Sequence, residues 1–148
     1  MHTYEVNLKW TGKTKGILSS TILPKEIEME SPPEYSNGTE GMWTPEHLLI
    51  AKINSCLMST FLTIADNSKL EFISYESKSI CTVEIISGKH LLLEIMLKPK
   101  VVVPYSQKPE RVKKILEMSK NVCLISNAIK TPIRLDSEII VSEIQRSF

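Results

Sequence analysis

The chain has 148 residues, and 18 lysines and arginines against 17 acidic residues leave a net charge of +1. That length fits one domain, residues 1–148, with a core of its own. The near-neutral charge gives no general electrostatic reason to expect binding to nucleic acid or to a membrane. No apolar run approaches the roughly 18 residues of a membrane span, and no signal-peptide pattern opens the chain. Three cysteines, odd in number and widely spaced, do not make a secreted disulfide framework, so we expect a cytoplasmic protein.

The first part of the sequence predicts short strands followed by a loop. Alternating side chains predict strands over residues 2–10, 17–23 and 27–29. Residues 11–16 have the chemistry of a hairpin turn, and Pro24-Lys25 is expected to break the chain before the third strand. Residues 31–43 contain two prolines and two glycines and predict a loop. A loop directly before a helix is a place where a site can be lined.

The longest helical signal covers residues 44–65 and is the centre of the predicted fold. Thr44 can cap this helix, and Pro45 suits its first position, where a missing N–H costs nothing. Glu46 lies in the first turn, where a carboxylate meets the positive end of the helix dipole. Further apolar residues cover most of the remaining sides, which indicates a buried helix that ends at residues 66–68. One face carries apolar residues at helical spacing, at positions 49, 53, 57, 61 and 64.

The second half of the sequence predicts a long hairpin, helices and a closing strand. The predicted elements are strands over residues 72–86 and 89–103, helices over 109–120 and 123–129, and a strand over 133–144. Ser87-Gly88 joins the two long strands, and Pro99 and Pro104 are expected to place the far end of the hairpin at an edge or bulge. The element order, with hairpins, predicts an α+β fold in which an antiparallel sheet is wrapped around the central helix.

The cysteines leave two interpretations open. Cys56 and Cys123 fall in predicted helices 67 positions apart, so they can form a redox pair only if the fold packs those helices together. Otherwise each is a small buried apolar residue, which is the role that we expect for Cys81 in its strand. The three histidines have no metal-ligand spacing with the cysteines, so we expect no metal site. The sequence also lacks a Gly-rich phosphate loop, a nucleophile elbow and a paired-carboxylate pattern.

Two motifs favour the redox pair. Thr44-Pro45-Glu46-x-Leu48-x-x-Ala51-x-x-x-x-Cys56, followed by Val122-Cys123-x-Ile125-Ser126-Asn127, resembles the two-cysteine signature of the OsmC/Ohr family. This family comprises osmotically inducible protein C and the organic hydroperoxide resistance proteins. The resemblance covers essentially the whole chain, and the paired motif is specific, whereas either half alone is weak. It implies an OsmC-like fold and an intertwined homodimer with two sites at the subunit interface.

The resemblance also implies a thiol-dependent peroxidase that acts on organic hydroperoxides. Cys56 matches the peroxidatic cysteine, whose thiolate attacks the O–O bond and becomes a sulfenic acid. Cys123 matches the resolving cysteine, which condenses with it to a disulfide that a dithiol later reduces. No metal or organic cofactor takes part in this chemistry.

The cation that would stabilise the thiolate is the main departure from the family. A thiolate at mid-helix gains little from the helix dipole, so it needs a nearby positive charge. The family supplies an arginine, in a Thr-Gly-x-Arg-x-Gly stretch or in the loop before the helix, but this chain has Thr14 at the first place and no arginine in the loop. Lys13 and Lys15 flank Thr14, and Lys52 lies one helical turn before Cys56. These lysines are the candidate cations, although Lys52 can equally extend its ammonium group to water.

The missing arginine keeps two further interpretations open. The chain can be an OsmC-like binding or structural protein that kept the fold and the cysteines. It can also be a thiol oxidoreductase or redox sensor without peroxide turnover. Peroxide consumption under a dithiol reductant separates the peroxidase from both.

Helix geometry limits the role of Glu46. Ten residues separate Glu46 from Cys56, which corresponds to a rise of about 15 Å and a difference in direction of about 80°. Glu46 therefore cannot touch the cysteine of its own helix. If it belongs to the site, as the resemblance implies, it must reach the cysteine of a partner subunit and orient the cation there. The alternative is that Glu46 only complements the helix dipole.

Overall fold

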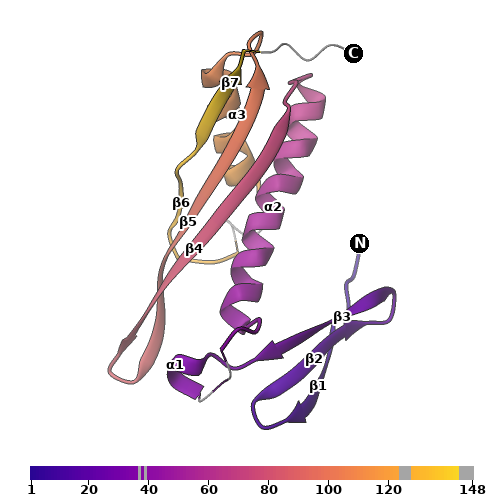
Figure 1. The fold of residues 1–148 in the computed structure, drawn as a ribbon, viewed down its shortest axis with the longest axis vertical. Helices are drawn as coiled ribbons and strands as arrows, with labels where there is room; N and C mark the ends of the chain where they lie inside the picture. The colour runs from indigo at the N-terminus through magenta and orange to yellow at the C-terminus, as the bar shows by residue number, and fades with distance from the viewer. Residues whose placement is uncertain (37, 39, 124–127, 144–148) are drawn as a thin grey trace. The chain divides into compact units, whose positions relative to one another are not determined.

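The computed structural model describes residues 1–36, 38, 40–123 and 128–143 (Figure 1). It contains two compact units, unit 1 with residues Met1–Leu49 and unit 2 with residues Ile50–Phe148. The α+β class is confirmed. That residues 1–148 form one domain stays a prediction.

Unit 1 is built on a three-stranded antiparallel sheet in the order β1-β2-β3. The strands are β1 (Asn7–Gly12), β2 (Lys15–Ser20) and β3 (Leu23–Glu30). Lys13 has a positive φ of 50° in the turn between β1 and β2, as a tight hairpin requires. The hairpin predicted around residues 11–16 is therefore confirmed.

The strand boundaries in unit 1 were predicted wrongly, because each depends on a pairing partner; β2 is Lys15–Ser20 rather than residues 17–23. β1 begins at Asn7 rather than at residue 2, since Asn7 pairs with Ser19 and β2 ends one residue later. The expected break at Pro24-Lys25 is also wrong. The chain turns before Leu23, and β3 runs through Pro24, which is tolerated because β3 is an edge strand of this sheet.

The segment that leads to the central helix contains a short helix, α1 (Pro33–Ser36), where the sequence predicted only a loop. Pro33 occupies its first position, which suits a residue without an N–H. The central helix, α2 (Pro45–Asn67), is confirmed. The backbone N–H of His47 donates to Oγ1 of Thr44, so Thr44 is its N-terminal cap.

α2 is also the described helix whose length and composition would let it cross a membrane, with a mean hydropathy of 1.6. Serines and threonines interrupt its apolar stretches, so the sequence shows no unbroken apolar run of that length although the average hydropathy of the helix is high. One such helix is weak evidence, since the core helix of a soluble protein passes the same test. In this protein Ile53, Leu57, Phe61 and Ala65 of α2 are buried in the fold.

Unit 2 contains a four-stranded sheet and helix α3 (Pro109–Val122). Its strands are β4 (Ser74–Ile86), β5 (Lys89–Pro104), β6 (Ile133–Leu135) and β7 (Glu138–Ser142). β4 and β5 form the predicted long antiparallel hairpin, but β6 and β7 both run parallel to β5. The sheet is thus mixed rather than antiparallel throughout, and the expected closing strand over residues 133–144 is two short strands. The short helix expected over residues 123–129 lies largely outside the described residues.

Pro99 explains why the closing strand is interrupted. The N–H of Ile95 donates to the carbonyl of Pro132, and the carbonyl of Leu97 accepts from the N–H of Asp136, so alternate residues of β5 direct their polar backbone groups toward β6. Pro99 continues this alternation but has no N–H to donate. Pairing with β6 ends at Leu97, and pairing with β7 begins at Lys100. The break therefore falls where β5 lacks a donor.

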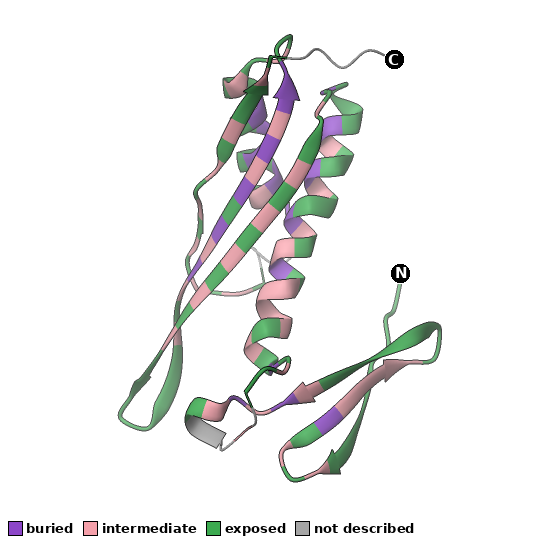
Figure 2. Ribbon diagram, viewed as in Figure 1, coloured by how far each residue is buried: buried purple, intermediate pink, exposed green. Residues whose placement is uncertain are grey.

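The hydrophobic core of unit 2 lies between the sheet and the two helices. α2 and α3 cover the same face of the sheet (Figure 1), and buried residues alternate with more exposed ones along β5 (Figure 2). The core combines residues of α2, β5 and α3 with Leu70, namely Phe61, Ala65, Leu70, Val101, Val103, Val112, Ile115 and Leu116. This packing fixes α3 beside α2, which positions the cysteines.

Candidate redox site

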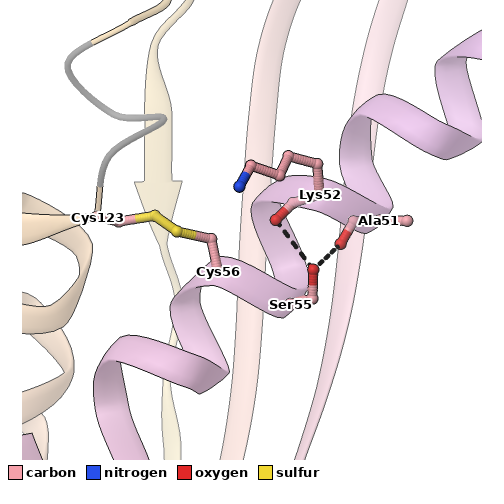
Figure 3. The surroundings of a disulfide bond; sticks show 5 residues. All are labelled: Ala51, Lys52, Ser55, Cys56 and Cys123. Carbon is pink, nitrogen blue, oxygen red and sulfur yellow. Dashed lines mark hydrogen bonds between the residues drawn. A yellow bond between two sulfur atoms is a disulfide. The ribbon is translucent and has the colours of Figure 1, made fainter. Parts of the chain in front are cut away.

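Cys56 and Cys123 form a disulfide, with their Cα atoms 6.3 Å apart (Figure 3). Cys56 lies in the middle of α2 and is half-buried. Cys123 directly follows α3 and is 3% exposed. The fold thus brings together the two cysteines that are 67 positions apart in the sequence. Cys81 is not part of this disulfide.

Cys123 continues the buried face of α3, which brings it next to α2. Val112, Ile115, Leu116 and Ser119 of α3 are buried, so they mark one face of that helix. Cys123 comes four residues after Ser119 and continues the same face, and its N–H donates to the Ser119 carbonyl at 3.0 Å. On α2, Cys56 lies beside the buried residues Ile53 and Leu57, at the border between the core and the surface.

Lys52 lies one helical turn before Cys56 on the same side of α2 (Figure 3). Its side chain is exposed, and it forms no ion pair with any other residue that the structure describes. The hydroxyl of Ser55 donates to the carbonyls of Ala51 and Lys52, at 2.7 and 3.1 Å, and so stays bound to its own helix. An uncommitted positive charge therefore stands beside the cysteine pair.

The remaining predicted site residues belong to unit 1. Lys13 lies in the turn between β1 and β2, Lys15 begins β2, and both are exposed. Glu46 is in the first turn of α2 and is half-buried. The roles of these three residues toward Cys56 stay predictions.

Both arginines among the described residues are engaged in structural contacts of unit 2. Arg111 donates to the side chain of Gln107 and to the carbonyl of Ser68 near the end of α2. Arg134 of β6 forms an ion pair with Glu94 of β5 at 3.0 Å. Neither replaces the family's arginine, which leaves Lys52 as the cation that the structure places beside the disulfide.

The position of the missing arginine is occupied by a different polar pair. The Thr14 hydroxyl donates to Oε1 of Glu30, and Glu30 is fully buried at the end of β3. The alternation of β3 gave no sign that this glutamate points inward, so sequence reasoning missed it. A buried carboxylate needs polar partners, and Thr14 is one of them.

A second polar link that the sequence analysis missed joins α2 to the sheet. The Asn54 side chain donates to the Ser77 carbonyl at 3.2 Å and accepts a hydrogen bond from the Ser77 hydroxyl. Asn54 between apolar positions of the helix was the available signal. In the same strand, burial raises the pKa of Tyr75 to about 12, despite the opposing effect of Ser77. Tyr75 therefore stays neutral at ordinary pH and packs against Phe61, with ring centroids 5.2 Å apart.

No group of three or more histidine, cysteine or carboxylate side chains that could hold a metal ion occurs among the described residues.

The sequence also matches a family model, that of OsmC-like protein, over residues 38–138. The chain belongs to the OsmC-like family. This match covers the central helix and both cysteines.

Solved structures of OsmC-like proteins share the fold. An OsmC-like protein of unknown function from Vibrio cholerae is 20% identical and superposes with a TM-score of 0.81, covering 93% of this chain and 99% of that one. An organic hydroperoxide resistance protein from Elizabethkingia anophelis is also 20% identical, with a TM-score of 0.73, covering 95% of this chain and 99% of that one. The OsmC-like fold expected from the resemblance is thereby confirmed.

A sequence relative was found in Bacillus subtilis. The uncharacterized protein YmaD is 23% identical over 148 residues, which cover 93% of each chain. The OsmC-like family thus places this protein among relatives that include organic hydroperoxide resistance proteins.

Proposed function

We propose that this OsmC-like protein is a thiol-dependent peroxidase that reduces organic hydroperoxides in the cytoplasm. The observation that carries the proposal is the Cys56–Cys123 disulfide, which joins the two residues that match the family's signature. The names of the organic hydroperoxide resistance proteins that share its fold support the choice of substrate class.

In the proposed reaction the Cys56 thiolate attacks one oxygen of the hydroperoxide O–O bond. The alkoxide leaves and takes a proton to become an alcohol, while Cys56 becomes a sulfenic acid. The Cys123 thiol then attacks the Cys56 sulfur, a water molecule leaves, and the disulfide forms. A dithiol exchanges with the disulfide and is itself oxidised. The sum is the conversion of hydroperoxide and dithiol to alcohol, water and the disulfide form of the dithiol.

The burial of the two cysteines supports this assignment of roles. The attacking cysteine must meet a substrate, and Cys56 is the more exposed of the pair. Cys123 is almost fully buried beside it, which suits a residue whose partner is another side chain of the same chain.

The direct test is peroxide consumption under a dithiol reductant. The parent protein should consume an organic hydroperoxide, and Cys56→Ser should abolish turnover. When no thiol is present, Cys123→Ser should consume about one equivalent of hydroperoxide and then stop. Cys81→Ser is the matched control and should keep full activity under the dithiol. Mass spectrometry after a mild hydroperoxide dose should show the Cys56–Cys123 bond. Oxidation chiefly at Cys81, with the pair still reduced, would contradict the proposal.

Lys52 is proposed to stabilise the Cys56 thiolate. Lys52→Met keeps the length of the side chain and removes its charge, so alkylation of reduced Cys56 at neutral pH should slow about threefold to tenfold. Lys114→Met, on the exposed side of α3, is the control for a lost surface charge. An unchanged alkylation rate in Lys52→Met would reject Lys52 and make Lys13 and Lys15 the next candidates.

Thr14 supports a second candidate function, because it occupies the place of the family's arginine and donates a hydrogen bond to Glu30. In this alternative the protein is a redox sensor or binding protein that forms the same disulfide without peroxide turnover. Under this alternative, hydroperoxide should oxidise Cys56 and Cys123 once, but the rate of consumption under excess dithiol should not exceed that of Cys56→Ser.

We propose further that the protein is a homodimer, in which Glu46 of one subunit orients the cation beside Cys56 of the partner subunit. Mixing Glu46→Gln chains with Cys56→Ser chains tests this arrangement, because a heterodimer would hold one intact site and one doubly impaired site. With random subunit exchange, about one quarter of all sites should be intact. Activity no higher than that of the separate variants, despite verified exchange, would reject a shared site and leave Glu46 as a residue that complements the helix dipole.

A further inference from the structure

The sheet of unit 2 carries a hollow that none of the redox residues lines. Its volume is about 390 Å³, within the range of small-molecule sites. Tyr75 and Ser77 of β4 contact α2, and side chains alternate along a strand, so the residues next to them point away from the helices. The hollow therefore lies on the face of the sheet opposite to the one that α2 and α3 cover. Charged residues dominate its lining, which includes Glu76, Lys78, Lys98, Lys100 and Glu138 together with Ile80.

Strand register arranges these charged residues in two rows across the sheet. In the first row, Lys100 of β5 lies opposite Glu76 of β4 on one side and opposite Glu138 of β7 on the other. In the second row, two residues further along β4, Lys78 lies directly opposite Lys98. The first row thus has an excess of negative charge. The second row places two like charges face to face, which is destabilising.

Ion pairs compensate the charges in the middle of the hollow but not those at its two ends. Nζ of Lys100 lies 3.6 Å from Oε1 of Glu76, and Nζ of Lys98 lies 4.0 Å from Oδ2 of Asp136. Lys78 and Glu138 form no ion pair with any residue that the structure describes. A cation without an ionic partner therefore stands at the β4 end, and an anion without one stands at the β7 end.

The separation of these two charges sets the length of a complementary ligand. Lys78 and Glu138 lie on the two strands that flank β5, and their rows differ by two residues along the sheet. With about 4.8 Å between strands and about 3.3 Å per residue, their Cα atoms are about 12 Å apart. An extended peptide of three residues spans about 10 Å, and the two long side chains can close the remaining distance.

We propose that this hollow binds a short zwitterionic peptide, of about three residues, through its two charged termini. The terminal carboxylate lies between Lys78 and Lys98 and relieves the repulsion between them, and the terminal ammonium group pairs with Glu138. A simple anion fits less well, because the carboxylates of Glu76, Glu138 and Asp136 are close to the lysines. No redox residue takes part, so this binding does not depend on the proposed peroxidase function.

The test titrates the oxidised full chain with trialanine and follows the amide shifts of the ¹⁵N-labelled protein. Trialanine should shift the amides of β4, β5 and β7 around the hollow, and the shifts should saturate. Two capped peptides serve as matched probes, since N-acetyltrialanine lacks the ammonium group and trialanine amide lacks the carboxylate. Each should bind about fivefold more weakly than trialanine, as expected for the loss of one solvent-exposed ion pair.

Substitutions at the two ends should each affect one terminus of the peptide. Lys78→Met should weaken trialanine about fivefold but leave trialanine amide unchanged, since the amide lacks the group that Lys78 binds. Glu138→Gln should likewise weaken trialanine but not N-acetyltrialanine. Lys114→Met and Glu110→Gln remove the same charges from exposed positions of α3 and should leave all affinities unaltered.

The comparison of the three peptides uses the parent protein, so it decides the question even if a variant fails to fold. A flat titration with trialanine, or equal affinity for trialanine and both capped peptides, overturns the site. The proposal also fails if Lys78→Met weakens trialanine and its amide equally, because the lysine then acts through the structure of the sheet rather than on the carboxylate.

Discussion

The two units of this OsmC-like protein differ in what they bury. Unit 2 has a continuous apolar core of eight buried residues, which come from two helices and a strand together with Leu70. The strands of unit 1 instead expose four of their large apolar side chains, those of Leu8, Trp10, Leu23 and Ile27, and its fully buried positions include Glu30. Trp10 is 72% exposed and Leu8 63% exposed.

Unit 1 therefore buries few apolar side chains within the single chain. A three-stranded sheet needs an apolar face packed against something to be stable on its own. A homodimer, which we propose, would supply that surface from a second copy. Unit 2 already contains the packing and the covalent link that its redox site requires.

The largest expected effect is in the core of unit 2. Phe61→Ala should lower the free energy of unfolding by about 3–5 kcal/mol, because it leaves a cavity among packed rings. Leu8→Ala on β1 is the matched change in unit 1 and should cost less than about 1 kcal/mol in the monomer. Chemical denaturation followed by circular dichroism measures both. Equal losses in a monomeric sample would contradict the difference between the units.

Reduction of the disulfide should be the next largest effect. The bond closes a loop across a sequence separation of 67, so its loss should cost about 2–4 kcal/mol through the greater freedom of the unfolded chain. The parent should unfold at lower denaturant concentration with a dithiol than without. Cys56→Ser should unfold at one midpoint under both conditions, and a shift in that variant would show that the reductant acts elsewhere.

Loss of the helix cap should have a smaller effect. Thr44→Ala removes the acceptor for the His47 N–H and should cost about 1 kcal/mol. Thr63→Ala, on an exposed side of the same helix, removes a hydroxyl that donates to the Ser59 carbonyl and should change stability by less than about 0.5 kcal/mol. Similar losses in both variants would show that α2 is insensitive to its first turn.

The smallest effect concerns Tyr75 at high pH. Its pKa is raised to about 12 in the folded chain, so above pH 10 the unfolded chain releases this proton while the folded chain keeps it. The stabilising contribution is complete below pH 10 and is lost as pH rises toward 12. Because the ring is only partly buried and solvent screens it, we expect a loss of less than about 1 kcal/mol. Tyr75→Phe should remove this part of the pH dependence, whereas Tyr4→Phe at an exposed position should retain it.

The features predicted correctly from the sequence are those that local chemistry determines. Thr44 and Pro45 predicted the start of α2, and the helical apolar repeat predicted three of its four buried residues, Ile53, Leu57 and Phe61. Ser87-Gly88, with positive φ at both residues, fixed the turn of the long hairpin. Each of these signals lies within the element that it specifies.

The features that were missed depend on residues distant in sequence. The break between β6 and β7 is caused by Pro99 on the neighbouring strand, and the start of β1 is set by the end of β2. The bond between Thr14 and Glu30 joins positions 16 residues apart. The pairing of Cys56 with Cys123 was implied by a family motif, since spacing alone left it open.

The disulfide also makes the chain between Cys56 and Cys123 a covalent ring, which contains all of β4, β5 and α3. The tip of the long hairpin lies within this ring, and Lys89 beside the Ser87-Gly88 turn is exposed. Trypsin acting there would open the ring without releasing either part while the disulfide is intact. The nicked oxidised chain should run as one species on a non-reducing gel and as two fragments after reduction, so a protease and a gel would report the redox state directly.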